Sequence, residues 1–108
     1  MSDEFGASAG MNEADRLRLA FYLQLSRRQR EIVCGVLRGM TNREIAATTY
    51  VVPGAVANRL TEIYAKLDEV PGAVVSRRAA RFDVVRFFGD FFTRYPELDK
   101  VGERLTSI

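Results

Sequence analysis

The stretch from Leu25 to Leu67 constrains the fold of this chain more than any other, because it marks several helix starts within a short length. Ser26 is followed three residues later by Gln29, and Thr41 is followed in the same way by Glu44. Each pair fits the capping box, in which a serine or threonine and a glutamate or glutamine satisfy free amides at a helix start. Two helices are therefore predicted to begin at these positions.

A third helix start is marked by Pro53, which suits the first helical position because its missing N–H is not needed there. Only Tyr50, Val51 and Val52 remain to connect this helix with the one that Thr41 begins. So short a connector makes two helices meet at an angle, which is the helix-turn-helix arrangement. In that arrangement the second helix can enter the major groove of DNA.

The helix predicted over residues 53–67 has one apolar side and one side of small or neutral residues. At about 100° per residue, the residues expected to be buried are Val56, Leu60, Ile63, Tyr64 and Leu67. The opposite side holds Gly54, Asn58, Thr61 and Ala65. Asn58 and Thr61 are the expected base contacts, because an amide pairs with adenine and a threonine offers a hydroxyl and a methyl group. Arg59 and Lys66 flank them as expected phosphate contacts.

Further phosphate contacts are expected at the start of the preceding helix, where backbone amides and the helix dipole favour an anion. Thr41, Asn42 and Arg43 lie there, although the same residues would also suit an ordinary exposed surface. Glu62 would be repelled by phosphates unless it accepted a hydrogen bond from cytosine. Basic residues three positions before it and four after it instead favour ion pairing along the helix surface.

The flanking segments complete an all-α plan, a four-helix helix-turn-helix domain with an N-terminal helix and a long amphipathic C-terminal helix. Residues 1–11 are small, polar and glycine-containing, so disorder is expected there. Asn12 is expected to cap a helix over about residues 13–24, and residues 12–70 are expected to form the helix-turn-helix domain, with its core at 25–67. Residues 71–108 then hold a break at Pro71 and Gly72, a helix from about residues 74–76 to Tyr95, and a polar tail.

The predicted C-terminal helix carries a large aromatic surface for so small a protein. Either one flank packs on the motif and the other on a second chain, or the helix folds entirely onto the first two helices. We favour the partner interpretation, because a symmetric dimer is the commonest closed assembly. The predicted dimer or partner interface consists of Val84, Phe87, Phe88, Phe91, Phe92 and Tyr95.

The distribution of charge is more informative than the net charge of +2. Residues 1–24 have a net charge of −2, whereas residues 25–67 have +4 and residues 76–94 have +3. The basic surplus thus lies on the motif and on the helix after it, where Arg77 and Arg78 are candidates for added contacts to a DNA backbone. A nucleic-acid partner fits this pattern, and a solvated basic surface without a ligand is the alternative.

Composition argues against several other classes of protein. The 108 residues, 47% of them apolar, suit one domain with a small core. With no histidine, no cysteine cluster and no phosphate-binding glycine loop, we expect no catalysis, no metal and no cofactor. The single Cys34 is expected to be a packing residue, and the lack of a signal pattern favours the cytoplasm, on the nucleoid. No run of 18 apolar residues is present, so no membrane span is expected.

The stretch Leu25–Leu67 resembles, without a gap, the DNA-binding domain of the LuxR/FixJ (GerE-type) transcription regulators. The family pattern reads L(S/T)xREREV, then G(L/M)(S/T)N(K/R)EIA, then a TVKxH core and a closing KL. The matching residues are Leu25, Ser26, Arg28, Arg30, Glu31, Gly39, Met40, Thr41, Asn42, Arg43, Glu44, Ile45, Ala46, Gly54, Val56, Asn58, Ile63, Lys66 and Leu67. The resemblance implies a four-helix domain whose third helix reads the major groove and whose fourth often forms a dimer interface.

The chain departs from the family pattern around the third helix, where Ser, Thr, Lys and His are usual. It has Val52, Ala55, Ala57 and Arg59 instead, which removes a capping hydroxyl and several DNA contacts and restores one positive charge. Family members usually carry a receiver or ligand-sensing domain upstream, and 24 residues cannot hold one, so a stand-alone form is expected.

Two functional hypotheses follow. The first is a homodimeric, sequence-specific regulator of transcription that binds double-stranded DNA. The alternative is a protein-binding module in which the same fold and the aromatic C-terminal helix bind another regulator or the transcription machinery.

Overall fold

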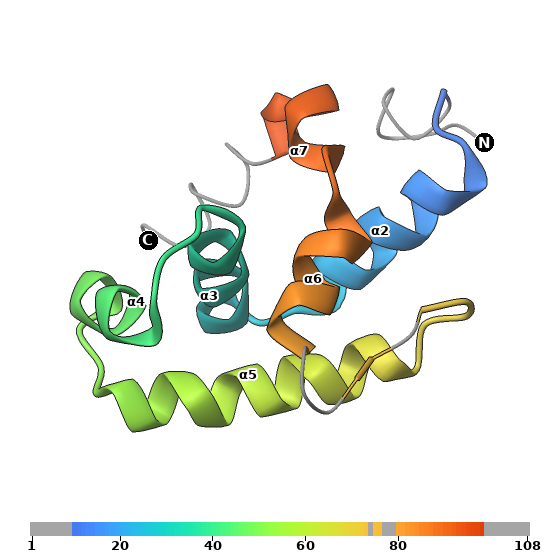
Figure 1. Ribbon diagram of the computed structural model, residues 1–108. Helices are drawn as coiled ribbons and strands as arrows, with labels where there is room; N and C mark the ends of the chain where they lie inside the picture. The colour runs from blue at the N-terminus through green and yellow to red at the C-terminus, as the bar shows by residue number, and fades with distance from the viewer. Residues whose placement is uncertain (1–9, 74, 77–79, 99–108) are drawn as a thin grey trace.

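Six α-helices and no strand make up the described part of the chain in the computed structural model (Figure 1). The structure describes residues 10–73, 75–76 and 80–98. The helices are α2 (Glu13–Gln24), α3 (Arg27–Leu37), α4 (Asn42–Thr49), α5 (Pro53–Asp68), α6 (Ala80–Phe88) and α7 (Phe91–Arg94). The protein is therefore all-α over this part, as predicted.

Local cap chemistry starts the helices where it was expected to. The Ser26 hydroxyl accepts from the Gln29 amide at 3.2 Å while the Gln29 side chain accepts from the Ser26 amide at 2.8 Å. Thr41 and Glu44 form the same reciprocal pair at 3.1 and 2.8 Å. Because each box satisfies two amides that a helix start leaves free, both predicted capping boxes are confirmed.

Helix α4 packs directly against α5, and a very short turn connects them. Tyr50 ends α4 in the left-handed conformation with φ 60° and ψ 40°. The amides of Tyr50 and Val51 both donate to the carbonyl oxygen of Ala46. This tight closure directs the chain into α5, which begins at Pro53 without a side-chain cap.

Helix α3 approaches α4 closely because Gly35 has no side chain. A Cβ atom built on Gly35 would lie 2.7 Å from Cγ1 of Ile45, closer than real carbon atoms pack. Ile45 and Ala46 on α4 are both buried. The close packing of α3 on α4 therefore depends on Gly35.

The predicted long C-terminal helix is wrong, because the chain breaks into α6 and α7. Gly89 adopts φ 53°, and its amide donates to the carbonyl of Val85 at 2.9 Å, which closes α6. The described residues 75–76 are not helical, so α6 also begins later than predicted. The break lets the chain change direction before Phe91, which is completely buried.

The predicted dimer interface is also corrected, because its central residues lie inside this chain's own core. Val84, Phe88 and Phe91 have no exposed surface. The ring of Phe88 lies 5.9 Å from that of Phe21 and 6.3 Å from that of Tyr22, both on α2. The alternative that we did not favour, folding of this segment onto the chain's own helices, describes these contacts.

The remaining residues of that predicted interface are half-buried on the same cluster. The Phe87 ring lies 5.4 Å from Phe21, and the Phe92 ring lies 4.9 Å from Tyr22. The Tyr95 hydroxyl donates to the Asp15 carboxylate at 3.3 Å. These side chains therefore attach α6 and α7 to α2.

The two ends of the chain fall largely outside the described residues. The predicted disorder of residues 1–11 lies outside them up to residue 9, and Met11, which is described, is buried with 4% exposure. Arg77, Arg78 and residues 99–108 are likewise outside the described residues. Among those described, no helix has the length and apolar character needed to cross a membrane.

Candidate nucleic-acid interface

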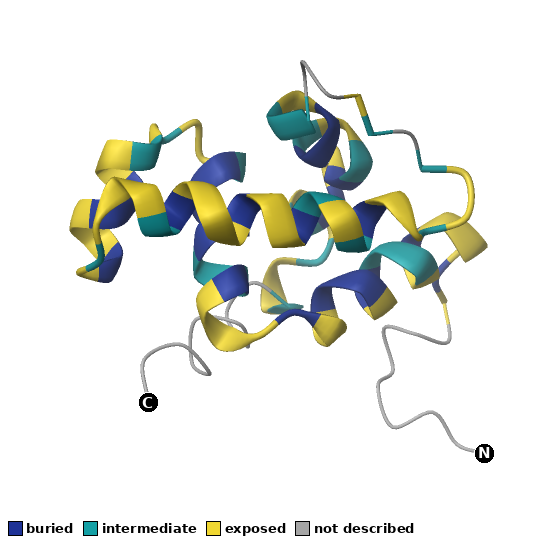
Figure 2. Cartoon of the chain, turned by 90° about the horizontal axis from the view of Figure 1, so that it is seen from below, coloured by how far each residue is buried: buried dark blue, intermediate teal, exposed yellow. Residues whose placement is uncertain are grey.

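One side of α5 is packed into the core and the other is open, as the spacing of its apolar residues predicted. Val56, Leu60, Ile63 and Leu67 are buried, and Tyr64 is half-buried. In Figure 2, which shows the molecule from below, α5 crosses the front with exposed residues along its outer side. The exposed residues of that side are Gly54, Ala57, Asn58, Arg59, Thr61, Glu62 and Ala65.

The two expected base contacts differ in how far they are already engaged. The Thr61 hydroxyl donates to the carbonyl of Ala57 at 3.2 Å, one helical turn back, which leaves its oxygen free to accept. The Asn58 amide makes no side-chain hydrogen bond to any other described residue. Asn58 therefore has its full set of donors and acceptors available.

Arg59 and Lys66, the expected phosphate contacts on α5, lie in different settings. Arg59 is half exposed and lies 3.6 Å from the Glu62 carboxylate, the pairing that its spacing indicated. Lys66 is half-buried, and its ammonium donates to the side-chain oxygen of Gln29 on α3 at 3.1 Å. Lys66 is thus directed toward α3, whereas Arg59 stays on the open side.

Gln29 joins α3 to α5 through polar contacts that the capping-box pattern alone did not predict. Its oxygen accepts from both Ser26 and Lys66, and its amide donates to Glu62 at 3.3 Å. Gln29 itself is only 5% exposed, whereas its partner Glu62 is half exposed, so these contacts are partly buried. Capping position was the only signal in the sequence, because the partners on α5 are more than thirty residues away.

The three expected phosphate contacts at the start of α4 differ in whether their side chains are already hydrogen-bonded. The Thr41 oxygen is occupied as the helix cap. Asn42 is half-buried, and its side-chain oxygen accepts from Arg81 of α6 at 2.9 Å. Arg43 is exposed, and no other described residue bonds to its side chain. Arg81 was missed as a site residue because it lies 39 positions from Asn42.

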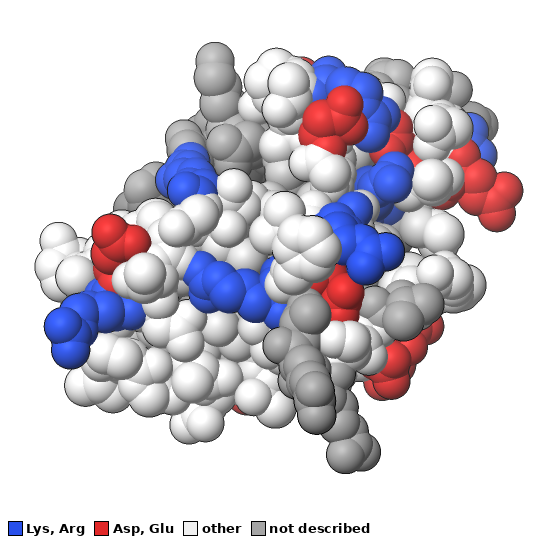
Figure 3. Space-filling view, viewed as in Figure 1, with Lys and Arg blue, Asp and Glu red and all other residues white. Residues whose placement is uncertain are grey.

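Charge is spread unevenly over the side of the molecule that Figure 3 shows, on which α5 forms the lower edge. In Figure 3, lysine and arginine side chains are scattered with acidic ones above α5, whereas the lower edge, which α5 forms, carries almost no charge. Apart from Arg59 and Glu62, which pair with each other, the exposed residues of α5 from Gly54 to Ala65 are small or neutral, as the sequence indicated. Such a surface permits close approach to base edges, and it leaves the attraction of a phosphate backbone to the flanking cations.

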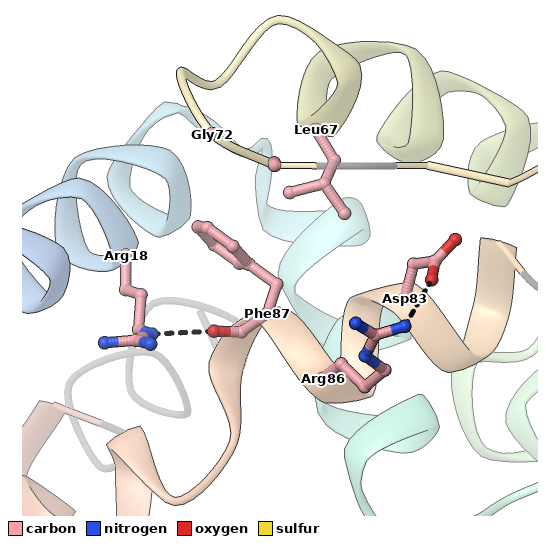
Figure 4. A pocket seen from close by; sticks show the side chains of 7 residues that line it. Arg18, Leu67, Gly72, Asp83, Arg86 and Phe87 are labelled. Carbon is pink, nitrogen blue, oxygen red and sulfur yellow. Dashed lines mark hydrogen bonds and ion pairs between the residues drawn. The ribbon is translucent and has the colours of Figure 1, made fainter.

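A hollow between α2, α6 and the end of α5 is lined by charged groups that are already paired (Figure 4). Arg18 donates to the carbonyl of Phe87 at 2.6 Å, and Arg86 lies 3.7 Å from the Asp83 carboxylate. Asp83 also accepts from the Ser76 amide at 2.6 Å. Within the described residues, no three histidine, cysteine or acidic side chains gather as a metal site would require.

Comparisons with protein-family models, with curated proteins and with solved structures found no match to this chain. The helices of the described residues define the class, a small all-α protein.

Proposed function

We propose that this protein binds double-stranded DNA and regulates transcription. More specifically, we propose that α4, the turn at Tyr50 and α5 form a helix-turn-helix unit of the LuxR/FixJ type. In this proposal α5 lies in the major groove, two copies act together, and the site of action is the nucleoid in the cytoplasm.

The observation that carries the proposal is the open side of α5. A helix that is buried on Val56, Leu60 and Ile63 presents Asn58 and Thr61 outward, with no bulky or acidic residue directly between them. Amide and hydroxyl groups at successive turns of one helix are the groups that read base edges. Arg59 on the same helix and the exposed Arg43 on α4 are the cations proposed to bind phosphates.

The direct test measures binding to a mixed-sequence DNA duplex at about 50 and about 200 mM salt. Affinity should fall with salt, because each neutralised phosphate releases counterions. Arg59→Glu should weaken binding strongly, whereas Arg16→Glu, the same change on an exposed position of α2, should have a much smaller effect. Binding without salt dependence, or equal effects of the two substitutions, would contradict the proposal.

Base reading needs a separate measurement. In a selection from random duplexes, the wild-type protein should enrich a defined sequence. Asn58→Ala should relax the preference at one position and cost about 1–3 kcal/mol there. If wild-type and variant proteins enriched the same unrestricted pool, Asn58 would have no part in specificity.

A second candidate function is protein recognition, and one observation favours it. Tyr50 is 93% exposed and Val52 is 67% exposed. Both lie in the short turn between α4 and α5. Aromatic residues such as tyrosine are enriched in the cores of protein–protein interfaces. This surface replaces the aromatic C-terminal helix that we expected in that role.

Purified RNA polymerase is the partner to test for this second function. If Tyr50→Ser with Val52→Ser abolishes a complex with the polymerase, and the wild-type protein binds no DNA at low salt, protein recognition is favoured. If the wild-type protein binds DNA and forms no such complex, protein recognition is rejected.

A further inference from the structure

Arg81, on the first turn of α6, lies at the meeting point of three helices. Its guanidinium donates to the side-chain oxygen of Asn42 on α4 at 2.9 Å. Helix α6 itself packs against α5. Burial raises the pKa of the Tyr64 hydroxyl on α5, and the positive charge of Arg81 acts against that rise. One half-buried cation thus borders both helices of the proposed DNA-binding unit.

Unlike five other described arginines, the half-buried Arg81 has no acidic partner within the described part of the chain. Arg18, Arg28, Arg59, Arg86 and Arg94 each lie within 3.7 Å of a carboxylate. Arg81 has only the neutral amide of Asn42 among the described residues. A half-buried guanidinium has lost part of its hydration, and a neutral acceptor compensates for that loss less well than an anion does.

The chain just before α6 lies along one flank of α5. Val75, Ser76 and Ala80 line a shallow hollow together with Thr61, Tyr64 and Ala65 of α5. The part of α5 from Thr61 onward is therefore bordered by another segment, whereas its first half, from Gly54 to Leu60, does not line this hollow. If α5 lies in the major groove of DNA, the bases are beside the first half of α5. The sugar-phosphate backbone of one strand then lies close to α6.

We propose that Arg81 binds a phosphate of that strand when the first half of α5 lies in the major groove. This inference rests on the proposed DNA-binding function and extends the interface beyond the helix-turn-helix unit to α6. Arg81 then has two roles. It holds Asn42 at the start of α4, and its remaining N–H groups bind the DNA backbone, for which the guanidinium fork is well suited.

The test compares Arg81→Gln with Arg86→Gln on a mixed-sequence duplex. Both substitutions remove one positive charge from α6, and Arg86 is an exposed residue that is already paired with Asp83. Loss of one phosphate contact lowers the slope of log affinity against log salt by about 0.9. The advantage of the wild-type protein over Arg81→Gln should therefore shrink about threefold between ~50 and ~200 mM salt.

Arg81→Lys should keep the wild-type slope, because it retains the charge. Folding of each variant is checked by its thermal melting curve. If Arg81→Gln does not fold, Arg81→Met takes its place, because methionine retains the apolar stem of the arginine.

The outcomes separate this inference from the proposed function. A reduced slope for Arg81→Gln, with wild-type slopes for Arg86→Gln and Arg81→Lys, supports the phosphate contact. If the wild-type protein binds DNA, and Arg59→Glu weakens it, but Arg81→Gln and Arg86→Gln keep the same slope, the inference on Arg81 is overturned alone. If the wild-type protein does not bind DNA at all, both proposals are overturned.

Discussion

Among single residues, Asp15 makes the most consequential polar contacts in the fold. It is completely buried on α2 and accepts hydrogen bonds from Arg18, from Arg94 on α7 and from the Tyr95 hydroxyl. Burial raises the pKa of the Asp15 carboxyl, but the hydrogen bonds and charges of Arg94 and Arg18 outweigh burial and hold it below its usual value. Asp15 thus connects the first described helix to the last.

Asp15→Asn should destabilise the protein by roughly 1–3 kcal/mol, because a buried acceptor of several hydrogen bonds becomes a poorer one. The lowered pKa means that the stabilisation is complete above the unfolded-state value of about 4 and is lost as pH falls below it. The difference in unfolding free energy between wild type and Asp15→Asn should therefore shrink as pH falls below about 4.

Urea unfolding at a series of pH values measures this difference. Asp90→Asn is the control, because Asp90 also pairs with Arg94, at 3.0 Å, but is 70% exposed. It should change stability by no more than about 1 kcal/mol. Equal effects of the two substitutions at neutral pH would show that burial of Asp15 does not matter.

At the scale of elements, local chemistry predicted where the helices begin. How the helices contact one another depends on long-range pairs of residues. Both capping boxes and the buried side of α5 follow from residues within four positions of one another. The contacts Gln29–Glu62 and Asn42–Arg81 join residues more than thirty positions apart. No single-sequence pattern encodes such pairs, so the candidate interface was predicted along α5 and missed on α6.

The break between α6 and α7 also shows that sequence patterns do not predict the effect of tertiary packing. Aromatic residues continue at helical spacing through Gly89, which favoured one long helix. The sequence Gly89-Asp90 was a weak signal for an ending, since glycine is common just past a helix end. What decides the break is tertiary packing, because Phe91 reaches the core only after the chain has turned.

Gly89→Ala gives opposite results for a broken and a continuous helix. At φ 53° an alanine is strained, so the substitution should destabilise the protein by about 1–2 kcal/mol. In a continuous helix it would instead stabilise by up to about 1 kcal/mol. Gly54→Ala is the control, because Gly54 lies in a helix with a negative φ and open space around it, and it should be neutral or stabilising. Thermal unfolding of both variants settles the sign.

At the scale of the whole molecule, the aromatic cluster decides what the C-terminal segment does. Phe88 packs with Phe21 and Tyr22 of α2 and with Phe91 of α7, so α6 and α7 complete the core. A domain of this size has a small core and about 5–15 kcal/mol of net stability. The segment therefore contributes to folding of a single chain, and two copies on DNA would have to meet through other surfaces.

Phe88→Ala should remove about 3–5 kcal/mol of stability, because it leaves a cavity where a completely buried ring had been. That is a large share of the total, so the variant should melt far below the wild type or remain unfolded. Phe82→Ala on the same helix is the matched control, because Phe82 is 59% exposed, and it should melt close to the wild-type temperature. Circular dichroism melting and the mass in solution separate the two roles of the cluster. A Phe88→Ala protein that melted like the wild type and changed only from dimer to monomer would restore the interface role, because an interface residue can be removed without unfolding each chain.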